Sequence, residues 1–310
     1  MTGYQEVLTD PSYAGQLVNL TYPLVGNYGI NPEDSESGRI QASGLVVREN
    51  CELPSHGRGN RTLHEFLASH GIPGIAEVDT RAITRRLRSK GVMLGIITRI
   101  YPDTALRRLQ GSPAYDDRDY VTIVTSPEEY DWDGGDGEDA ESKHRILVTD
   151  CGLKYNILRQ LRRRDCRVTV VPAATPAEEL LAMKPSGILF SPGPGDPKLL
   201  DYVVNNTRKV LGQVPVMGIC LGHQIIARAL GADTFKLKFG HRGGNHPVKD
   251  LADGRVYITA QNHGYAVSPD KLPSGLEVSH INLNDQTVEG FRHKSLPLFT
   301  IQYHSEASPG

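Results

Sequence analysis

The chain has 310 residues, of which 38% are hydrophobic, and its formal net charge at pH 7 is −2. This length can supply more than one hydrophobic core, so we expect two domains. The chain lacks the large basic surplus that would indicate a nucleic-acid partner. No stretch approaches the ~20 apolar residues of a membrane span. Met1 is followed by polar residues, unlike a signal peptide, and the four cysteines form no CxxC pair. We expect free thiols and a soluble protein of the reducing cytoplasm.

The first 126 residues show mixed strand and helix patterns and are expected to form one domain. The clearest element is the amphipathic segment 62–70, which predicts a helix. A basic run at 85–90 also falls in a helical pattern. It is interpreted as a solvated helix face rather than a binding patch, although a partner-protein surface stays open.

A linker is predicted over residues 127–143. Residues 127–142 contain eight acidic residues, three glycines and no base. Such a composition cannot pack a core and is typical of a solvated connection. The second domain is therefore expected to cover residues 144–310.

Strand and helix patterns alternate through this second domain. Strands are expected at 144–150, 167–171 and 188–190, helices at 154–164, 176–183 and 198–211, and a further strand just before Cys220. This alternation predicts an α/β fold with a doubly wound, mostly parallel sheet and helices on both faces. Ligands of such sheets lie at the carboxyl ends of the strands.

Cys220 is the most informative residue of the sequence. It lies where the apolar strand pattern 214–219 meets the helical pattern that begins at Leu221. The positive end of a helix dipole favours a thiolate at such a turn, and Gly218 and Gly222 permit close approach of helix and strand. We therefore predict that Cys220 is a nucleophile, with an inert buried cysteine as the alternative.

His304 and Glu306 follow the strand pattern that begins at Leu298. Residues i and i+2 of an extended chain lie on the same side, so the carboxylate can orient the imidazole. The free ring nitrogen can then accept the thiol proton, which predicts a catalytic triad of Cys220, His304 and Glu306. The alternative is an ordinary solvated strand end.

A rigid Pro/Gly loop, Ser191-Pro-Gly-Pro-Gly-Asp-Pro197, follows the apolar run 187–190. A rigid backbone at a strand end can direct an N–H group at a developing oxyanion. The backbone N–H groups of Gly193 and Leu221 are the predicted oxyanion hole, and an ordinary turn is the alternative. No Gly-Lys-Ser/Thr follows, so the loop is not a phosphate-binding P-loop.

Four histidines are close in sequence, but their spacing matches no structural zinc pattern. No carboxylate accompanies them at a helical ligand spacing, so no metal is predicted. These residues are His223, His241, His246 and His263.

Together these motifs resemble class I, triad-type glutamine amidotransferases, whose nucleophile motif matches Gly218-Ile-Cys-Leu-Gly-His-Gln224. Segments throughout the chain resemble, more narrowly, the small, glutamine-hydrolysing subunits of carbamoyl-phosphate synthetases. Examples are residues 1–13, 20–27, 79–81, 238–249 and 261–264. The N-terminal block is absent from other amidotransferases of this class and selects this subfamily.

The resemblance implies that Cys220 forms a γ-glutamyl thioester. Eight positions match the family's glutamine contacts: Ser12, Gly193, Gly195, Leu221, Gln224, Asn262, Gly264 and Tyr265. Two positions differ from the family pattern. Tyr265 stands where relatives often have phenylalanine, and Ser305 where they often have proline. Neither exchange removes a catalytic group. Relative to the family, the chain begins inside the N-terminal domain without its leading strands and stops at Gly310 before an expected final helix.

The same resemblance implies a large synthetase subunit as partner, in a heterodimer or higher heteromer. That subunit would use ATP, bicarbonate and magnesium to make carbamoyl phosphate from the ammonia, for arginine or pyrimidine synthesis. No cofactor is expected on this chain. Two alternatives stay open, another cysteine hydrolase on the same fold and a non-catalytic regulatory subunit.

Overall fold

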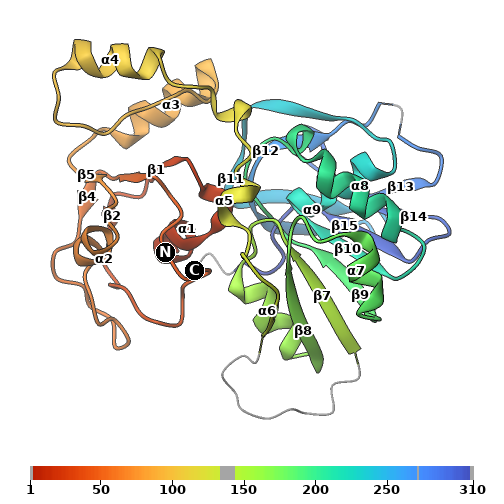
Figure 1. The fold of residues 1–310 in the computed structure, drawn as a ribbon. Helices are drawn as coiled ribbons and strands as arrows, with labels where there is room; N and C mark the ends of the chain where they lie inside the picture. Colours follow the sequence, from red (N-terminus) through yellow and green to blue (C-terminus); the bar gives the residue numbers. More distant parts are fainter. Residues whose placement is uncertain (1–2, 133–143, 271, 308–310) are drawn as a thin grey trace. The chain divides into compact units, whose positions relative to one another are not determined.

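The computed structural model describes residues 3–132, 144–270 and 272–307 (Figure 1). The described residues up to Arg118 form one compact unit, and those from Asp119 onward form another. The division at residues 126 and 144 stays a prediction, and residues 133–143 of its linker lie outside the described residues. None of the described helices is long and apolar enough to cross a membrane.

The first unit contains short elements around a small core. A three-stranded parallel sheet has the order β1-β3-β5, and β2 pairs with β4. Tyr4, Leu8, Leu45 and Leu63 are among its fully buried side chains. In chain order the elements are α1 (Tyr4–Thr9), η1 (Pro11–Tyr13), β1 (Leu17–Asn19), β2 (Leu24–Val25), β3 (Gly44–Val46), β4 (Glu49–Asn50), α2 (Leu63–Ser69), β5 (Gly74–Ile75), α3 (Thr80–Lys90), α4 (Pro102–Gln110) and η2 (Tyr115–Asp117).

Helix α2 occupies the segment predicted to be helical. Thr62 caps it by accepting a hydrogen bond from the Glu65 N–H, and the Glu65 carboxylate accepts one from the Thr62 N–H. This reciprocal arrangement satisfies N–H groups that the first turn of a helix leaves without partners.

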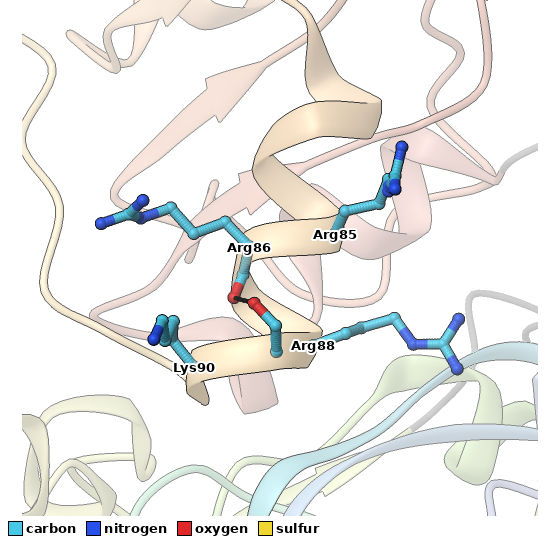
Figure 2. Close-up of a pocket in the computed structure, with 5 residues that line it drawn as sticks. Arg85, Arg86, Arg88 and Lys90 are labelled. Atoms are coloured by element: carbon cyan, nitrogen blue, oxygen red, sulfur yellow. Dashed lines mark hydrogen bonds between the residues drawn. The ribbon is translucent and has the colours of Figure 1, made fainter.

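The basic run lies on α3, and its side chains are exposed. Arg85, Arg86, Arg88 and Lys90 line a surface hollow, but Figure 2 shows them pointing in different directions from the helix. Divergent cations do not form a convergent binding site, so α3 is not the candidate site of this chain.

The second unit contains a ten-stranded sheet with the order β12-β11-β13-β14-β15-β10-β9-β7-β8-β6. Its centre, from β8 to β15, is parallel, whereas the strands beyond on either side pair antiparallel. The helices are α5 (Val121–Val124), α6 (Tyr155–Arg162), α7 (Ala177–Ala182), η3 (Pro197–Leu199), α8 (Asp201–Val210) and α9 (Leu221–Ala229). The strands are β6 (Tyr130–Trp132), β7 (His144–Asp150), β8 (Cys166–Pro172), β9 (Gly187–Phe190), β10 (Val216–Ile219), β11 (Thr234–Asp250), β12 (Val256–Val267), β13 (Leu276–Asn282), β14 (Val288–His293) and β15 (Leu298–Ile301).

Helices cover both faces of the parallel centre, as predicted. Leu147 packs in one core with residues of α7, α8 and α9, whereas its neighbour Val148 packs in another with residues of α6. Successive side chains of a strand point to opposite faces, so a strand buried on both sides must be apolar throughout. The α/β fold with a doubly wound parallel centre is confirmed.

Three details differ from the sequence analysis. The helix predicted from residue 198 begins at Asp201, after the separate turn η3. Residues 130–132 of the predicted linker form β6, where Asp131 accepts a hydrogen bond of 2.6 Å from Thr169 and Trp132 packs on Tyr155. The antiparallel strands β11 to β14 were not predicted, because they alternate with no helices.

Close packing of β10 against α9 requires glycine at residue 218. A Cβ atom there would lie 2.6 Å from Ile226 Cδ1 and 2.7 Å from the carbonyl carbon of Gly222. Both distances are shorter than any normal contact, and the second involves backbone that cannot rotate away.

We expect Gly218→Ala to lower the free energy of unfolding by about 1–3 kcal/mol, because the core must expand around the added methyl group. Urea denaturation followed by circular dichroism measures the change. Gly57→Ala is the control, since a Cβ at Gly57 has no atom within 4 Å. Equal stability of the two variants would contradict the packing argument.

Candidate active site

Cys220 lies at the turn between β10 and α9 and is 1% exposed. Its backbone is strained, with φ 53° and ψ −104°. Gly222 lies so close to the Phe190 carbonyl that a Cβ would overlap it. Strained residues at such strand-to-helix turns present a nucleophile at the edge of the sheet, and helix packing holds them there.

His304 and Glu306 come together beyond the end of β15. His304 Nδ1 lies 2.7 Å from Glu306 Oε1, and both side chains are buried. The connecting residues are not the extended strand that the sequence suggested. His304 forms an isolated bridge with Ala260, and Ser305 and Glu306 form a turn.

Lys154 completes this charged group, and the sequence analysis missed it. Its Nζ lies 2.6 Å from Glu306 Oε1, the oxygen that also bonds His304, and its side chain is 6% exposed. Asn156 Nδ2 donates to the Glu306 backbone carbonyl. Lys154 belongs to no sequence motif and directly precedes α6, so its ion pair with Glu306 is seen only in the folded structure.

The buried charges shift one another's ionisation. Burial alone would raise the pKa of Glu306, but the Lys154 ammonium and His304 outweigh it and hold that pKa well below its usual range. Burial and Lys154 act to lower the pKa of His304, but Glu306 and Cys220 outweigh them and raise it to about 10. The Glu306 carboxylate therefore fixes a proton on Nδ1 of His304.

The other ring nitrogen of His304 is available for proton transfer. His304 Nε2 is buried and has no hydrogen-bond partner among the described residues. Cys220 is nevertheless close enough to affect the pKa of His304. A long nucleophile-to-base contact is common before substrate binds.

The Gly193 loop lies against the start of α9. A Cβ at Gly193 would overlap the Cys151 carbonyl and come within 2.7 Å of Leu221 Cδ2. Leu221 is the first residue of α9, so its N–H has no acceptor within the helix. The structure thus brings the two predicted oxyanion residues together, while their role stays a prediction.

The turn after β7 packs against the loop that contains Gly193. Asp150 accepts hydrogen bonds from the N–H groups of Gly152 at 3.0 Å and Leu153 at 2.8 Å. Gly152 in turn leaves no room for a Cβ, which would lie 2.7 Å from Gly193 Cα. Lys154 directly follows this turn.

Residues of β12 lie beside Cys220. The Asn262 carbonyl oxygen lies 3.9 Å from Cys220 Sγ, and Asn262 Nδ2 is buried without a hydrogen-bond partner among the described residues. Gln224 Nε2 donates to the Tyr265 carbonyl at 2.8 Å and to Gln302 Oε1 at 2.9 Å. Of the other predicted contacts, Gly195 follows Gly193 in the loop and Gly264 lies on β12.

Ser12 belongs to the first unit, where it is buried in η1 and its Oγ has no hydrogen-bond partner among the described residues. Its role in binding glutamine stays a prediction from family resemblance.

Two of the four histidines lie beside a carboxylate that sequence spacing did not reveal. Ligand atoms of His241, His263 and Glu289 lie within 4.8 Å of one another, close enough to be considered for a metal. Both ring nitrogens of His263 face protein oxygens, Tyr265 O at 2.7 Å and Gln261 Oε1 at 2.9 Å, and the ring's single N–H donates to one of them. The absence of a metal stays a prediction.

Comparison with known proteins identifies the family. A class-I glutamine amidotransferase model matches residues 147–310, and a model of the CPSase domain of the carbamoyl-phosphate synthase small chain matches residues 1–97. The carbamoyl phosphate synthase small chain of Akkermansia muciniphila is 52% identical over 100% of this chain and 85% of its own length. This chain belongs to the carbamoyl phosphate synthase small chain family.

Other small chains agree over the same span. Those of Syntrophotalea carbinolica and Methanopyrus kandleri are 49% and 50% identical over 100% of this chain and 85% and 86% of their own lengths. Among solved structures, a glutamine amidotransferase of Thermotoga maritima is 20% identical with a TM-score of 0.43, and covers 53% of this chain and 77% of its own. As a small chain, the protein is a glutamine amidotransferase subunit.

The Glu306 charges predict a pH-dependent stability. The stabilisation from ionised Glu306 is present above its ordinary pKa of 4.5 and is lost in acid. The stabilisation from protonated His304 is present below its ordinary pKa of 6.5 and is lost as the pH rises through about 10. We expect the difference in unfolding free energy between wild type and Glu306→Gln to be largest between pH 4.5 and 6.5.

Chemical denaturation at a series of pH values from about 4 to about 10 measures this difference, because that range includes the ordinary pKa values of Glu306 and His304. Glu277→Gln is the control, because the Glu277 side chain is 44% exposed and pairs with the exposed Arg292 rather than with a buried charge. A difference for Glu306→Gln that does not change with pH would show that the buried charges are not coupled as described.

Proposed function

We propose that this small chain hydrolyses L-glutamine to glutamate and ammonia through a thioester on Cys220, and that the ammonia passes to a large synthetase subunit. The observation that carries the proposal is the strained turn holding Cys220, together with the buried pair of His304 and Glu306. The substrate is inferred from the family, and the geometry of the site supports the proposed chemistry.

In the first half-reaction, the Cys220 thiolate attacks the side-chain carbonyl carbon of glutamine. The N–H groups of Gly193 and Leu221 stabilise the oxyanion, and they need no rearrangement because the loop is rigid. The intermediate collapses as His304 Nε2 gives its proton to the departing nitrogen. Ammonia leaves, and the γ-glutamyl thioester remains on Cys220.

In the second half-reaction, neutral His304 takes a proton from water, and the resulting hydroxide attacks the thioester carbonyl. The second oxyanion collapses, glutamate leaves, and the Cys220 thiolate and protonated His304 are restored. Glu306 stabilises the imidazolium at both stages. Lys154 keeps Glu306 ionised, because its charge makes protonation of that carboxylate unfavourable.

Glutamine recognition requires fixed polar groups for its ammonium and carboxylate. The unpartnered Asn262 amide can donate a hydrogen bond to the substrate. Both amide protons of Gln224 are used within the protein, so its oxygen is the atom that can accept one. We assign Ser12, Gly195, Gly264 and Tyr265 to the same site from the family pattern.

The partner follows from the names of the relatives, since a small chain requires a large one. We propose that the large subunit binds ATP, bicarbonate and magnesium and forms carbamoyl phosphate, and that this chain holds no cofactor. The first unit, which matches the CPSase domain model, is the proposed docking surface.

Replacing Cys220 tests the nucleophile. Cys220→Ser should reduce glutaminase activity by about 10⁴-fold or more, because an alcohol is far less ionised than a thiol at neutral pH. Ammonia release from glutamine measures the rate, and a glutamine-mimicking electrophile should label Cys220 in the wild type. Unchanged hydrolysis in the variant would rule out this nucleophile.

The matched control is His223→Asn, in the same helix. His223 is buried, bonds Thr300 Oγ1 through Nδ1 at 2.8 Å, and burial lowers its pKa to about 3, so it is not the base. This variant should hydrolyse glutamine at nearly the wild-type rate. Wild-type protein that turns over peptides or esters but not glutamine would indicate a different cysteine hydrolase.

Capture of the partner tests the second half of the proposal. The wild-type chain should co-purify with a large synthetase subunit, and the complex should make carbamoyl phosphate from glutamine. With Cys220→Ser the same complex should use only free ammonia, because the ammonia source is removed while the synthetase is intact. Synthesis from glutamine by that variant complex would contradict ammonia transfer from this chain.

A further inference from the structure

A second buried polar group lies on the antiparallel strands beside the site. We call it the Glu289 cluster, and it joins side chains from β11, β12, β13 and β14. Its members are His241, Gln261, His263, Asn282 and Glu289, none of them more than 6% exposed. The proposed reaction uses none of them.

Glu289 is the centre of this cluster and is 0% exposed. Its Oε1 accepts a hydrogen bond of 2.9 Å from Asn282 Nδ2, and its Oε2 accepts one of 2.9 Å from Gln261 Nε2. His241 Nδ1 lies 3.5 Å from Oε1. Burial opposes the charge, but His241, His263 and the two amides outweigh it and lower the pKa of Glu289.

The cluster reaches the active site through Gln261. Its Oε1 lies 2.9 Å from His263 Nε2, and His263 Nδ1 lies 2.7 Å from the Tyr265 carbonyl oxygen. Burial lowers the pKa of His263 to about 3, so the neutral ring carries one N–H and donates to one of these two acceptors. Gln224 Nε2 bonds that same carbonyl at 2.8 Å. A series of close polar contacts therefore connects Glu289 to α9, the helix that Cys220 precedes.

Asn262 lies between the two β12 residues that the cluster holds. Side chains alternate along a strand, so Asn262 is on the opposite face of β12 from Gln261 and His263. Its backbone carbonyl is 3.9 Å from Cys220 Sγ, and its amide nitrogen has no partner among the described residues. A buried amide without a partner keeps its direction only if its backbone is held from the other side.

We propose that Glu289 is a positioning residue, which fixes β12 so that Asn262 and Gln224 present their polar groups to glutamine. The inference rests on the proposed glutaminase function. Glu289 itself does not touch the substrate. Removing it takes the carboxylate acceptor from two buried amides, which leaves Gln261 Nε2 only Thr259 Oγ1 and Asn282 Nδ2 only the longer contact to His241 Nδ1, and so loosens the packing on this face of β12.

Kinetics of Glu289→Ala test the proposal. We expect KM for glutamine to rise about tenfold or more while kcat changes less than about threefold, because substrate alignment is lost and the triad is intact. Glu289→Gln should recover part of the loss, since its amide oxygen accepts one of the two bonds. Glu277→Ala, which removes an exposed carboxylate from β13, should leave both constants unchanged.

A binding measurement separates this inference from the proposed function. Calorimetry compares glutamine binding to Cys220→Ser with binding to Cys220→Ser/Glu289→Ala, and circular dichroism checks that both are folded. Weaker binding in the double variant supports the positioning role, and equal binding overturns it while leaving the glutaminase proposal standing. No binding to either variant contradicts both proposals.

Two further results would overturn the inference. A Glu289→Ala variant that is folded but loses kcat with KM unchanged would place Glu289 in the chemical step. One equivalent of a divalent metal in the purified protein, lost in Glu289→Ala, would make the cluster a metal site instead.

Discussion

The meeting of three buried charges at one carboxylate oxygen is the interaction on which the site depends. Glu306 Oε1 bonds both Lys154 and His304, and all three side chains are nearly inaccessible to water. A buried carboxylate with only one partner would tend to take up a proton. With two cationic partners it stays ionised, so it stabilises the protonated His304 ring and holds it through Nδ1.

The central sheet and the turn around Cys220 were predictable because their signals are local. Apolar strands alternating with helices specify a parallel centre, and a cysteine at a strand-to-helix boundary specifies the turn around Cys220. The pairing of His304 with Glu306 was also expected, because only Ser305 separates them in the sequence. The expected strand geometry was wrong, since a turn brings the side chains together there.

Lys154 and Glu289 were not predictable for the opposite reason. Each interacts with residues that are distant in sequence, and neither belongs to a spacing pattern. Lys154, before α6, meets Glu306, which follows β15, and Glu289 of β14 meets Gln261 of β12, although β11 and β13 separate these two strands in the sheet order. Sequence spacing reports contacts along a helix or strand, whereas these contacts depend on strand order, and the antiparallel extension itself had no sequence signal.

The turn after β7 has one further consequence. Asp150 fixes the backbone that packs under Gly193, and the same short turn leads directly to Lys154. Lys154, which acts on the charges of Glu306 and His304, and the loop that we propose to hold the oxyanion are therefore joined through one short turn. If heating loosens that turn, the proposed acid–base chemistry and the proposed oxyanion binding should be lost at the same temperature, and neither should be lost alone.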